Sequence, residues 1–283
     1  MFRFLALLAL LLPLAPAQAY WEYGHETIAR IAYANVRPAT RAAIRRVLAD
    51  QALLGTPECP AGDVAQASYW ADCVKPLKDA AGQSRFGYAY AWHYQNVDVC
   101  RPFDRTSACI DGNCVSAQVE RQAALLRAPG TARADRVRAL AFLLHFAGDL
   151  HQPLHAGDKS DRGGNDLAAA YGIYAPKRFN IHSVWDGPLA ERAITSGSPL
   201  ARRYSAATRA RLAAGDVASW SRESWQVSHD AVYASALGGD ACAPSPARVT
   251  LDDATVARLA PTLRDQVLKG GLRLAKLLDR ALG

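Results

Sequence analysis

Two histidine–aspartate pairs stand at spacings that suit metal binding. His145 and Asp149 are four residues apart, and His182 and Asp186 repeat that spacing. Residues four apart in a helix lie on one face, one turn from each other, so each pair could coordinate one metal ion. One such pair is usually a surface or capping interaction. Two pairs, the first inside the apolar stretch 140–150 where a buried acid and imidazole need partners, predict a metal centre.

Other residues could complete the metal coordination. His155 lies just beyond Pro153, where the helix containing His145 must end, and Asp72 and His93 lie upstream. Taken alone, Asp72 could be a surface charge and His93 a core residue. Histidine and carboxylate ligands without thiolate suit zinc, and can suit manganese or iron. A catalytic zinc keeps one position open for water, which three protein ligands per ion would allow.

The start of the chain has the pattern of an export signal. Arg3 precedes the apolar run 4–14, and Ala17-Gln18-Ala19 is a small-x-small cleavage pattern. A retained membrane anchor is the alternative, but the run is short for a bilayer span. Cleavage after Ala19 would make Tyr20 the first residue. Its free amine, its carbonyl oxygen and the nearby His25 could then share one ion, because an α-amino group binds metal once deprotonated.

Length and composition favour one exported domain. Removing residues 1–19 from the 283 leaves 264 residues and a net charge of about +6, which weakly favours a polyanionic partner. No second apolar stretch reaches the length of a membrane span. All six cysteines follow the signal, none in a C-x-x-C pair, so we expect disulfides rather than a thiolate zinc site. Cys109 and Cys114 would close a small local loop, and the other pairings stay open.

Helical periodicity dominates the sequence, so we predict an all-α, single-domain fold with long functional loops and disulfide bonds. Alternating strand patterns are scarce, and 171–174 is the best small candidate. The predicted helices cover residues 24–36, 38–54, 64–74, 133–150, 180–194, 216–237 and 252–282.

These motifs together resemble a known family. In chain order they are Gly24-His25, Trp70-Ala71-Asp72, Trp92-His93-Tyr94, His145-x3-Asp149-x5-His155, Gly163-Gly164-Asn165 and His182-Ser-Val-Trp-Asp186. The set resembles the zinc-dependent single-strand-specific nucleases of fungi, plants and bacteria, within the phospholipase C/nuclease superfamily. The resemblance runs from residue 20 to about residue 237, and the segment 148–155 is its most specific part.

The resemblance implies three zinc sites. The first would use Asp72, His93, His145 and Asp149, and the second would use His155, His182 and Asp186. The third would use the amine and carbonyl of Tyr20 with His25, and Asp149 would bridge the first and third ions. Relatives usually begin with Trp, but backbone atoms make those bonds, so Tyr20 should serve.

The resemblance also points to substrate-binding residues. Lys75 could contact a phosphate oxygen or be a solvated lysine, and Tyr94 could stack on a base or belong to the core. Asn165 could hydrogen-bond the substrate or only shape its loop. Where fungal and plant relatives carry an aspartate three residues after the first-site histidine, this chain has Asn96, and Asp98 is out of register.

We therefore expect a zinc-dependent endonuclease, with Asp72, Lys75 and Asp149 as catalytic residues. It would hydrolyse single-stranded DNA and RNA to 5′-phosphate products, act on nucleotides as a 3′-nucleotidase, and be a periplasmic or secreted monomer without stable membrane association. The alternatives are a zinc phospholipase C, whose second site ends in His-x3-Glu, and a non-catalytic zinc-binding protein of the periplasm.

Two histidines remain outside these sites. His151 could face solvent or support Asp149. His229 lies among Trp225, Val232 and Tyr233, and we expect a structural role for it.

Overall fold

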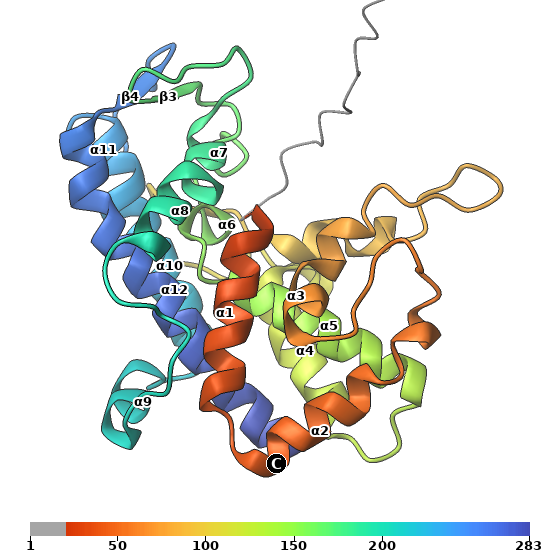
Figure 1. The fold of residues 1–283 in the computed structure, drawn as a ribbon. Helices are drawn as coiled ribbons and strands as arrows, with labels where there is room; N and C mark the ends of the chain where they lie inside the picture. Colours follow the sequence, from red (N-terminus) through yellow and green to blue (C-terminus); the bar gives the residue numbers. More distant parts are fainter. Residues whose placement is uncertain (1–20) are drawn as a thin grey trace, which may run out of the picture.

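The computed structural model describes residues 21–283, and it is built almost entirely from helices (Figure 1). The expected export signal and Tyr20 lie outside the described residues. The α-helices are α1 (Trp21–Asn35), α2 (Pro38–Leu48), α3 (Val64–Cys73), α4 (Val115–Arg127), α5 (Arg133–Asp149), α6 (Pro153–Ala156), α7 (Ile181–Asp186), α8 (Pro188–Thr195), α9 (Ala206–Leu212), α10 (Val217–Val227), α11 (Ala234–Ala236) and α12 (Asp253–Leu282). The predicted all-α single-domain class is confirmed.

Helix α5 is the centre of the fold. Its residues from Ala139 to Asp149 are all buried, so it is apolar around its whole circumference, as expected of a helix surrounded by others. Helices α3 and α4 pack along it, and α1 lies between α3 and the long α12. The polar side chains of α5 are therefore placed in the interior, where they need partners.

Short elements complete the chain. They are the helical turns η1 (Gln51–Leu54), η2 (Gly87–His93) and η3 (Ile110–Gly112), and the π-helical η4 (Ser228–Tyr233). Strand β1 (Val97–Asp98) pairs in parallel with β2 (Gly157–Asp158), and β3 (Ala169–Tyr171) pairs in parallel with β4 (Val249–Leu251). The first ladder joins the segment after His93 to the segment after His155, which brings two predicted ligands together.

Some predicted elements have different bounds in the structure. The helix predicted over 180–194 is two helices, because Gly187 departs from helical geometry and Pro188 starts α8 without an amide hydrogen. The helix predicted over 38–54 ends at Leu48 and continues only as η1. The strand candidate 171–174 contributes only Tyr171 to β3, and Tyr174 bridges back to it across a turn.

Helices α4 and α9 were missed by the sequence analysis. In α4, Val115, Val119, Gln122 and Leu126 are buried at spacings of four, three and four, which is a helical signal. A cysteine-rich loop directly before it concealed where that periodicity began.

Three disulfides use all six cysteines. The predicted Cys109–Cys114 bridge is confirmed, and the others are Cys59–Cys73 and Cys100–Cys242. Cys73 directly follows Asp72, so its bridge to Cys59 fixes the end of α3 that carries a predicted metal ligand. Within residues 21–283, no helix is both long and apolar enough to cross a membrane.

The α1–α12 contact depends on Gly271. A Cβ atom there would lie 2.5 Å from the side chain of Ile31, so Gly271→Ala must push the two helices apart. We expect a loss of about 1–3 kcal/mol in the free energy of unfolding, measured by chemical denaturation. Gly130→Ala, where a Cβ meets open space, should change it by less than about 0.5 kcal/mol. Equal effects of the two substitutions would contradict this packing argument.

Candidate metal centre

Four predicted ligands converge on one point. Asp72 comes from the last turn of α3, His93 from η2, and His145 and Asp149 from one face of α5. The Nδ1 atom of His93 lies 3.0 Å from Oδ2 of Asp149 and 3.0 Å from Nε2 of His145. Oδ1 of Asp72 lies 3.5 Å from both of these nitrogen atoms, and His145 Nε2 lies 3.0 Å from Asp149 Oδ2.

These separations fit a tetrahedral ion. Ligand atoms at 2.0–2.1 Å from a tetrahedral zinc are about 3.3 Å from each other, and the measured edges of 3.0–3.5 Å bracket that value. Two imidazoles and two carboxylates also match the ligand types that zinc accepts. The residues predicted for the first site therefore form a donor set of suitable chemistry and spacing.

Backbone carbonyls fix the histidine tautomers. Nδ1 of His145 lies 2.7 Å from the Ser68 carbonyl oxygen, and Nδ1 of His155 lies 2.8 Å from that of His93. A carbonyl oxygen only accepts, so each Nδ1 carries the hydrogen, and Nε2 of the neutral ring presents its lone pair. Both rings are thereby prepared to coordinate through Nε2.

The second cluster shows the same preparation. His182 donates from Nδ1 to the Gly163 carbonyl at 2.7 Å, and its Nε2 lies 3.2 Å from His155 Nε2. Two lone pairs at that distance repel unless a proton or a metal ion lies between them. Asp186 brings Oδ2 to 3.1 Å from His182 Nε2 and Oδ1 to 4.0 Å from His155 Nε2. This three-ligand set could hold an ion and leave a position open.

The third cluster joins the first through Asp149. His25 in α1 stacks on His145 with ring centroids 3.9 Å apart, and its Nε2 lies 3.6 Å from Oδ1 of Asp149. Asp149 thus offers one oxygen to each cluster, as the predicted bridge requires. Gly148 makes this stacking possible, because a Cβ there would lie 2.6 Å from the His25 ring. The predicted contribution of Tyr20 lies outside the described residues.

The field inside the centre favours charged acids but treats the rings differently. Against the effect of burial, Asp149 raises the pKa of His145 and Asp186 raises that of His182, whereas the pKa values of His25 and His93 are lowered. Burial opposes ionisation of Asp149, but His145 and His155 hold its pKa well below the usual value. Burial likewise opposes ionisation of Asp72, but the positive charges of His145 and Lys75 outweigh that effect and lower its pKa to about 2. Burial lowers the pKa of His25 to about 3 and, with Lys75, that of His93 to about 4. Ionised carboxylates and neutral imidazoles are the forms that bind metal.

The predicted substrate residues lie in three different settings. Lys75 Nζ lies 2.5 Å from Asp72 Oδ1 with its side chain partly exposed, so an ammonium group borders the first cluster. Tyr94 is half-buried and meets the exposed Tyr90 edge-to-face, with ring centroids 6.4 Å apart. Asn165 is exposed, but its amide donates to the Arg162 carbonyl at 2.9 Å, which is the loop-shaping arrangement.

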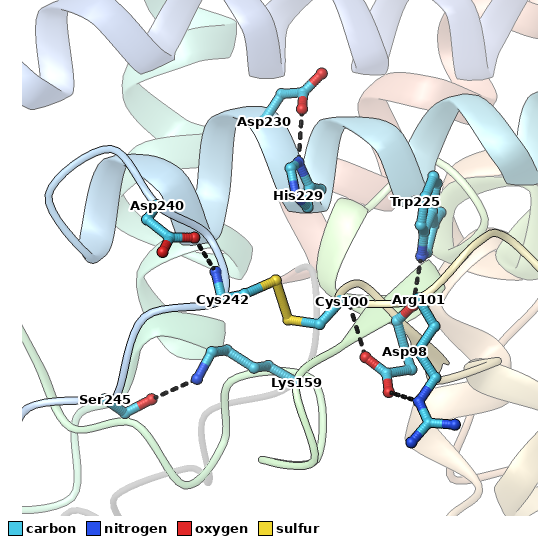
Figure 2. Close-up of a disulfide and its surroundings, with 10 residues drawn as sticks. All are labelled: Asp98, Cys100, Arg101, Lys159, Trp225, His229, Asp230, Asp240, Cys242 and Ser245. Atoms are coloured by element: carbon cyan, nitrogen blue, oxygen red, sulfur yellow. Dashed lines mark hydrogen bonds and ion pairs between the residues drawn. A yellow bond between two sulfur atoms is a disulfide. The ribbon is translucent and has the colours of Figure 1, made fainter.

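Asp98 does not replace the carboxylate missing at Asn96. Its side chain accepts a hydrogen bond from the Cys100 amide at 2.8 Å and pairs with Arg101 at 3.2 Å, beside the Cys100–Cys242 disulfide (Figure 2). Asn96 adopts a positive φ of 51°, which asparagine tolerates better than most residues. Asn96 therefore suits the left-handed backbone conformation that the chain adopts at this position.

Neither remaining histidine contacts the metal clusters. His151 is buried and bonds Ala147 O and Arg273 Nη1, so neither predicted role, facing solvent or supporting Asp149, is correct. His229 stacks on Trp225, one of the residues among which it lies in the sequence, and bonds Asp230 at 2.7 Å, on the partly exposed side of the π-helical segment (Figure 2).

The sequence analysis missed Gln152, a residue that positions Asp186. Its Nε2 donates to Oδ1 of Asp186 at 2.6 Å. The amide oxygen of the same side chain, Oε1, accepts from the Leu154 amide at 2.6 Å. The side chain is fully buried, so it couples the start of α6 to the carboxylate of α7. Its position directly before Pro153 gave no local signal for a partner 34 residues away along the chain.

The fold and the site define a helical, disulfide-bonded protein with a three-part histidine–aspartate centre. The family model for S1/P1 nuclease matches residues 20–283, and the chain belongs to that family. Endonuclease 4 of Arabidopsis thaliana is 28% identical over 281 residues, covering 93% of this chain and 89% of its own. Nuclease S1 of Aspergillus oryzae is 27% identical over 300 residues, covering 98% and 97%. Endonuclease 2 of Arabidopsis thaliana is 26% identical over 304 residues, covering 96% and 94%.

Acid should destabilise the metal-free protein steeply. Burial lowers the pKa of His25 to about 3, of His93 to about 4 and, with Arg273, of His151 to about 3, whereas unfolded histidines titrate near 6.5. Below pH 6.5 these three histidines become protonated in the unfolded chain but stay neutral in the folded chain. The free energy of unfolding should fall by up to roughly 4 kcal/mol per pH unit until about pH 4.

Urea denaturation of chelator-treated protein at several pH values measures that slope. His229→Gln removes a partly exposed histidine and should leave the slope unchanged. A free energy of unfolding that stays flat between pH 6.5 and 4 would show that these rings are not held neutral.

Loss of the Gln152 amide should weaken the second cluster selectively. Gln152→Ala frees Asp186 to turn, and removal of such supporting hydrogen bonds typically costs about 10–100-fold in metal affinity. Titration with zinc, followed by calorimetry, should show one weakened site. Gln118→Ala is the matched control, because among residues 21–283 the side chain of this buried glutamine bonds only Gly112 O and Gln122. Unchanged zinc binding in Gln152→Ala would exclude the positioning role.

Proposed function

We propose that this protein is an exported zinc-dependent endonuclease that hydrolyses phosphodiester bonds of single-stranded DNA and RNA, leaving 5′-phosphates, and that also acts as a 3′-nucleotidase. The convergence of three histidine–aspartate clusters on Asp149 is the observation that carries this proposal. Membership of the S1/P1 nuclease family and relatives named as endonucleases support the nuclease reaction.

Three zinc ions would be held by residues of this chain. His93 with Asp72, His145 and Asp149 would hold the first, and His155, His182 and Asp186 the second. His25 would hold the third with the amine and carbonyl of Tyr20, if processing starts the mature chain there. When bound, zinc lowers the pKa of coordinated water to about 7 and stabilises charge on phosphoryl oxygens.

The protein's own groups would orient and neutralise the substrate. Lys75 stays cationic, because Asp72 and Asp149 raise its pKa against the effect of burial, so its ammonium group can bind a non-bridging phosphate oxygen. Asp149 stays ionised and cannot donate a proton, so its role is to hold ions and repel misplaced anions. Tyr94 offers a ring face on which an unpaired base can stack, which would favour single strands.

Export is part of the same proposal, and we propose that the exported protein is a monomer. Three disulfides fit folding in an oxidising compartment, and the small-x-small pattern before Tyr20 fits signal cleavage, so residues 20–283 would form the mature domain in the periplasm or outside the cell.

Metal analysis combined with N-terminal sequencing tests the proposal. We expect three zinc ions per chain, a Tyr20 start, and hydrolysis of single-stranded but not duplex DNA that EDTA abolishes and zinc restores. Asp149→Asn should lower kcat by about 10³-fold or more, since one oxygen of Asp149 faces the first cluster and the other faces the third, whereas Asp166→Asn on an exposed loop should not. Full activity of metal-free protein would refute the proposal.

Parallel assays separate the alternatives. Turnover of phosphatidylcholine without DNA cleavage would identify a phospholipase C. Zinc binding without turnover of any phosphodiester would identify a non-catalytic zinc-binding protein.

A further inference from the structure

A basic groove lies at the end of the molecule away from the metal centre. It has a volume of about 550 Å³ and lies between α9, the second half of α12 and the end of α1 (Figure 1). Helix α1 connects the two regions, because His25 belongs to the metal centre and Asn35 lines the groove. Ten residues of helix place the groove about 15 Å from His25 along the α1 axis.

Cations form the rim of this α9–α12 groove. Arg37, Arg209, Lys276 and Arg280 line it, against one acid, Asp279. Asp279 already accepts a hydrogen bond from the Arg37 amide at 3.0 Å and lies 3.5 Å from Arg37 Nε, so it neutralises little of the remaining charge.

The adjoining chain adds to the positive field. Residues 202–211 contain three arginines besides Arg209, and residues 37–46 contain three besides Arg37, with no acid in either segment. Burial and the neighbouring Arg280 lower the pKa of Lys276, which agrees with a crowded group of cations. A groove with this balance attracts anions and discriminates against cations.

Some donors of the groove are occupied and others are free. Lys276 Nζ donates to the carbonyls of Ala213 and Gly215 at 2.7 Å, which leaves one N–H of the ammonium group. Arg209 uses Nη1 to bind the carbonyl of Asn35, and its planar guanidinium has further N–H groups. Arg280 is exposed and, among the residues that the structure describes, makes no hydrogen bond or ion pair. Its guanidinium is therefore available to a phosphate.

The floor is built from small apolar side chains. Ala206, Ala210, Ala213, Ala275 and Leu272 line it between the cations. None of the exposed large hydrophobic side chains of the described chain lines the groove, so it lacks the residues that insert into a lipid surface. A smooth floor with a cationic rim instead suits a sugar–phosphate strand.

We propose that the α9–α12 groove binds the phosphate backbone of a single-stranded nucleic acid at a distance from the metal centre. The inference rests on the proposed nuclease function and extends it, because a strand held here would tether a long substrate without touching the scissile bond. A dinucleotide bound at the metals could not reach the groove, whereas an oligonucleotide of about 20 nucleotides could occupy both.

Kinetics of the zinc-loaded, processed protein on these two substrates test the inference. In the double variant Arg280→Glu/Lys276→Gln, KM for the long oligonucleotide should rise about tenfold at low salt. The slope of log KM against log salt should fall by about 1.4, since each lost phosphate contact contributes about 0.7. Both kcat values and KM for the dinucleotide should stay unchanged. Arg280→Glu alone, at an exposed residue, should give half of the slope change if Lys276→Gln disturbs folding.

Arg258→Glu is the matched control. It makes the same charge change at an exposed site on α12, far from the groove, and should alter KM by less than about twofold. An unchanged KM and salt slope in the Arg280 variants would overturn the inference.

Direct binding separates this inference from the proposed function. Fluorescence anisotropy of the labelled oligonucleotide on chelator-treated protein should show weaker binding in Arg280→Glu, even if no phosphodiester is ever cleaved. Arg280-dependent binding of phosphatidylglycerol vesicles, with no oligonucleotide binding, would overturn the nucleic-acid assignment.

Discussion

The burial of Asp149 among histidines is the constraint on which the rest of the structure depends. A fully buried carboxylate is unfavourable unless charge and hydrogen bonds compensate for lost hydration. Here His25, His93, His145 and His155 all approach its two oxygens within 3.6 Å. Those four rings come from α1, η2, α5 and α6, so satisfying one acid requires four elements to meet. The interior of this fold is arranged around a charge.

The elements around Asp149 are held by contacts that do not involve a metal. Carbonyl oxygens of Ser68, His93 and Gly163 fix three imidazoles, and these carbonyls lie in α3, η2 and the loop before β3. The β1–β2 ladder and the Cys59–Cys73 bridge hold two of these segments in place. Since each ring is oriented by the backbone of another element, the tautomers and directions are fixed by folding. Folding thus provides the free energy needed to bring these mutually repelling groups together before any ion binds.

Sequence reasoning predicted the histidine–aspartate pairs of α5 and α7 because their signals are local. The spacings 145–149 and 182–186 specify one helical face, and Pro153 specifies where α5 must end. The helical class followed for the same reason, since periodicity is a property of short windows. Gln152 and the Cys100–Cys242 bridge were beyond reach because they join segments 34 and 142 residues apart, and nothing local fixes such a pairing. His151 was misjudged because its partner, Arg273, comes from the distant α12.

Helices α1 and α12 connect two regions of the molecule that differ in the charge of their side chains. The start of α1 contributes His25 to an acidic, buried centre, whereas its end and α12 border exposed arginines and lysines. An anionic polymer is attracted by the basic end, so its approach is favoured from that side. Ions bound among the carboxylates would add positive charge to the centre and make both ends attractive. Metal occupancy would then control where a strand can lie as well as whether it reacts, because the same buried charge that organises the fold also decides the local field.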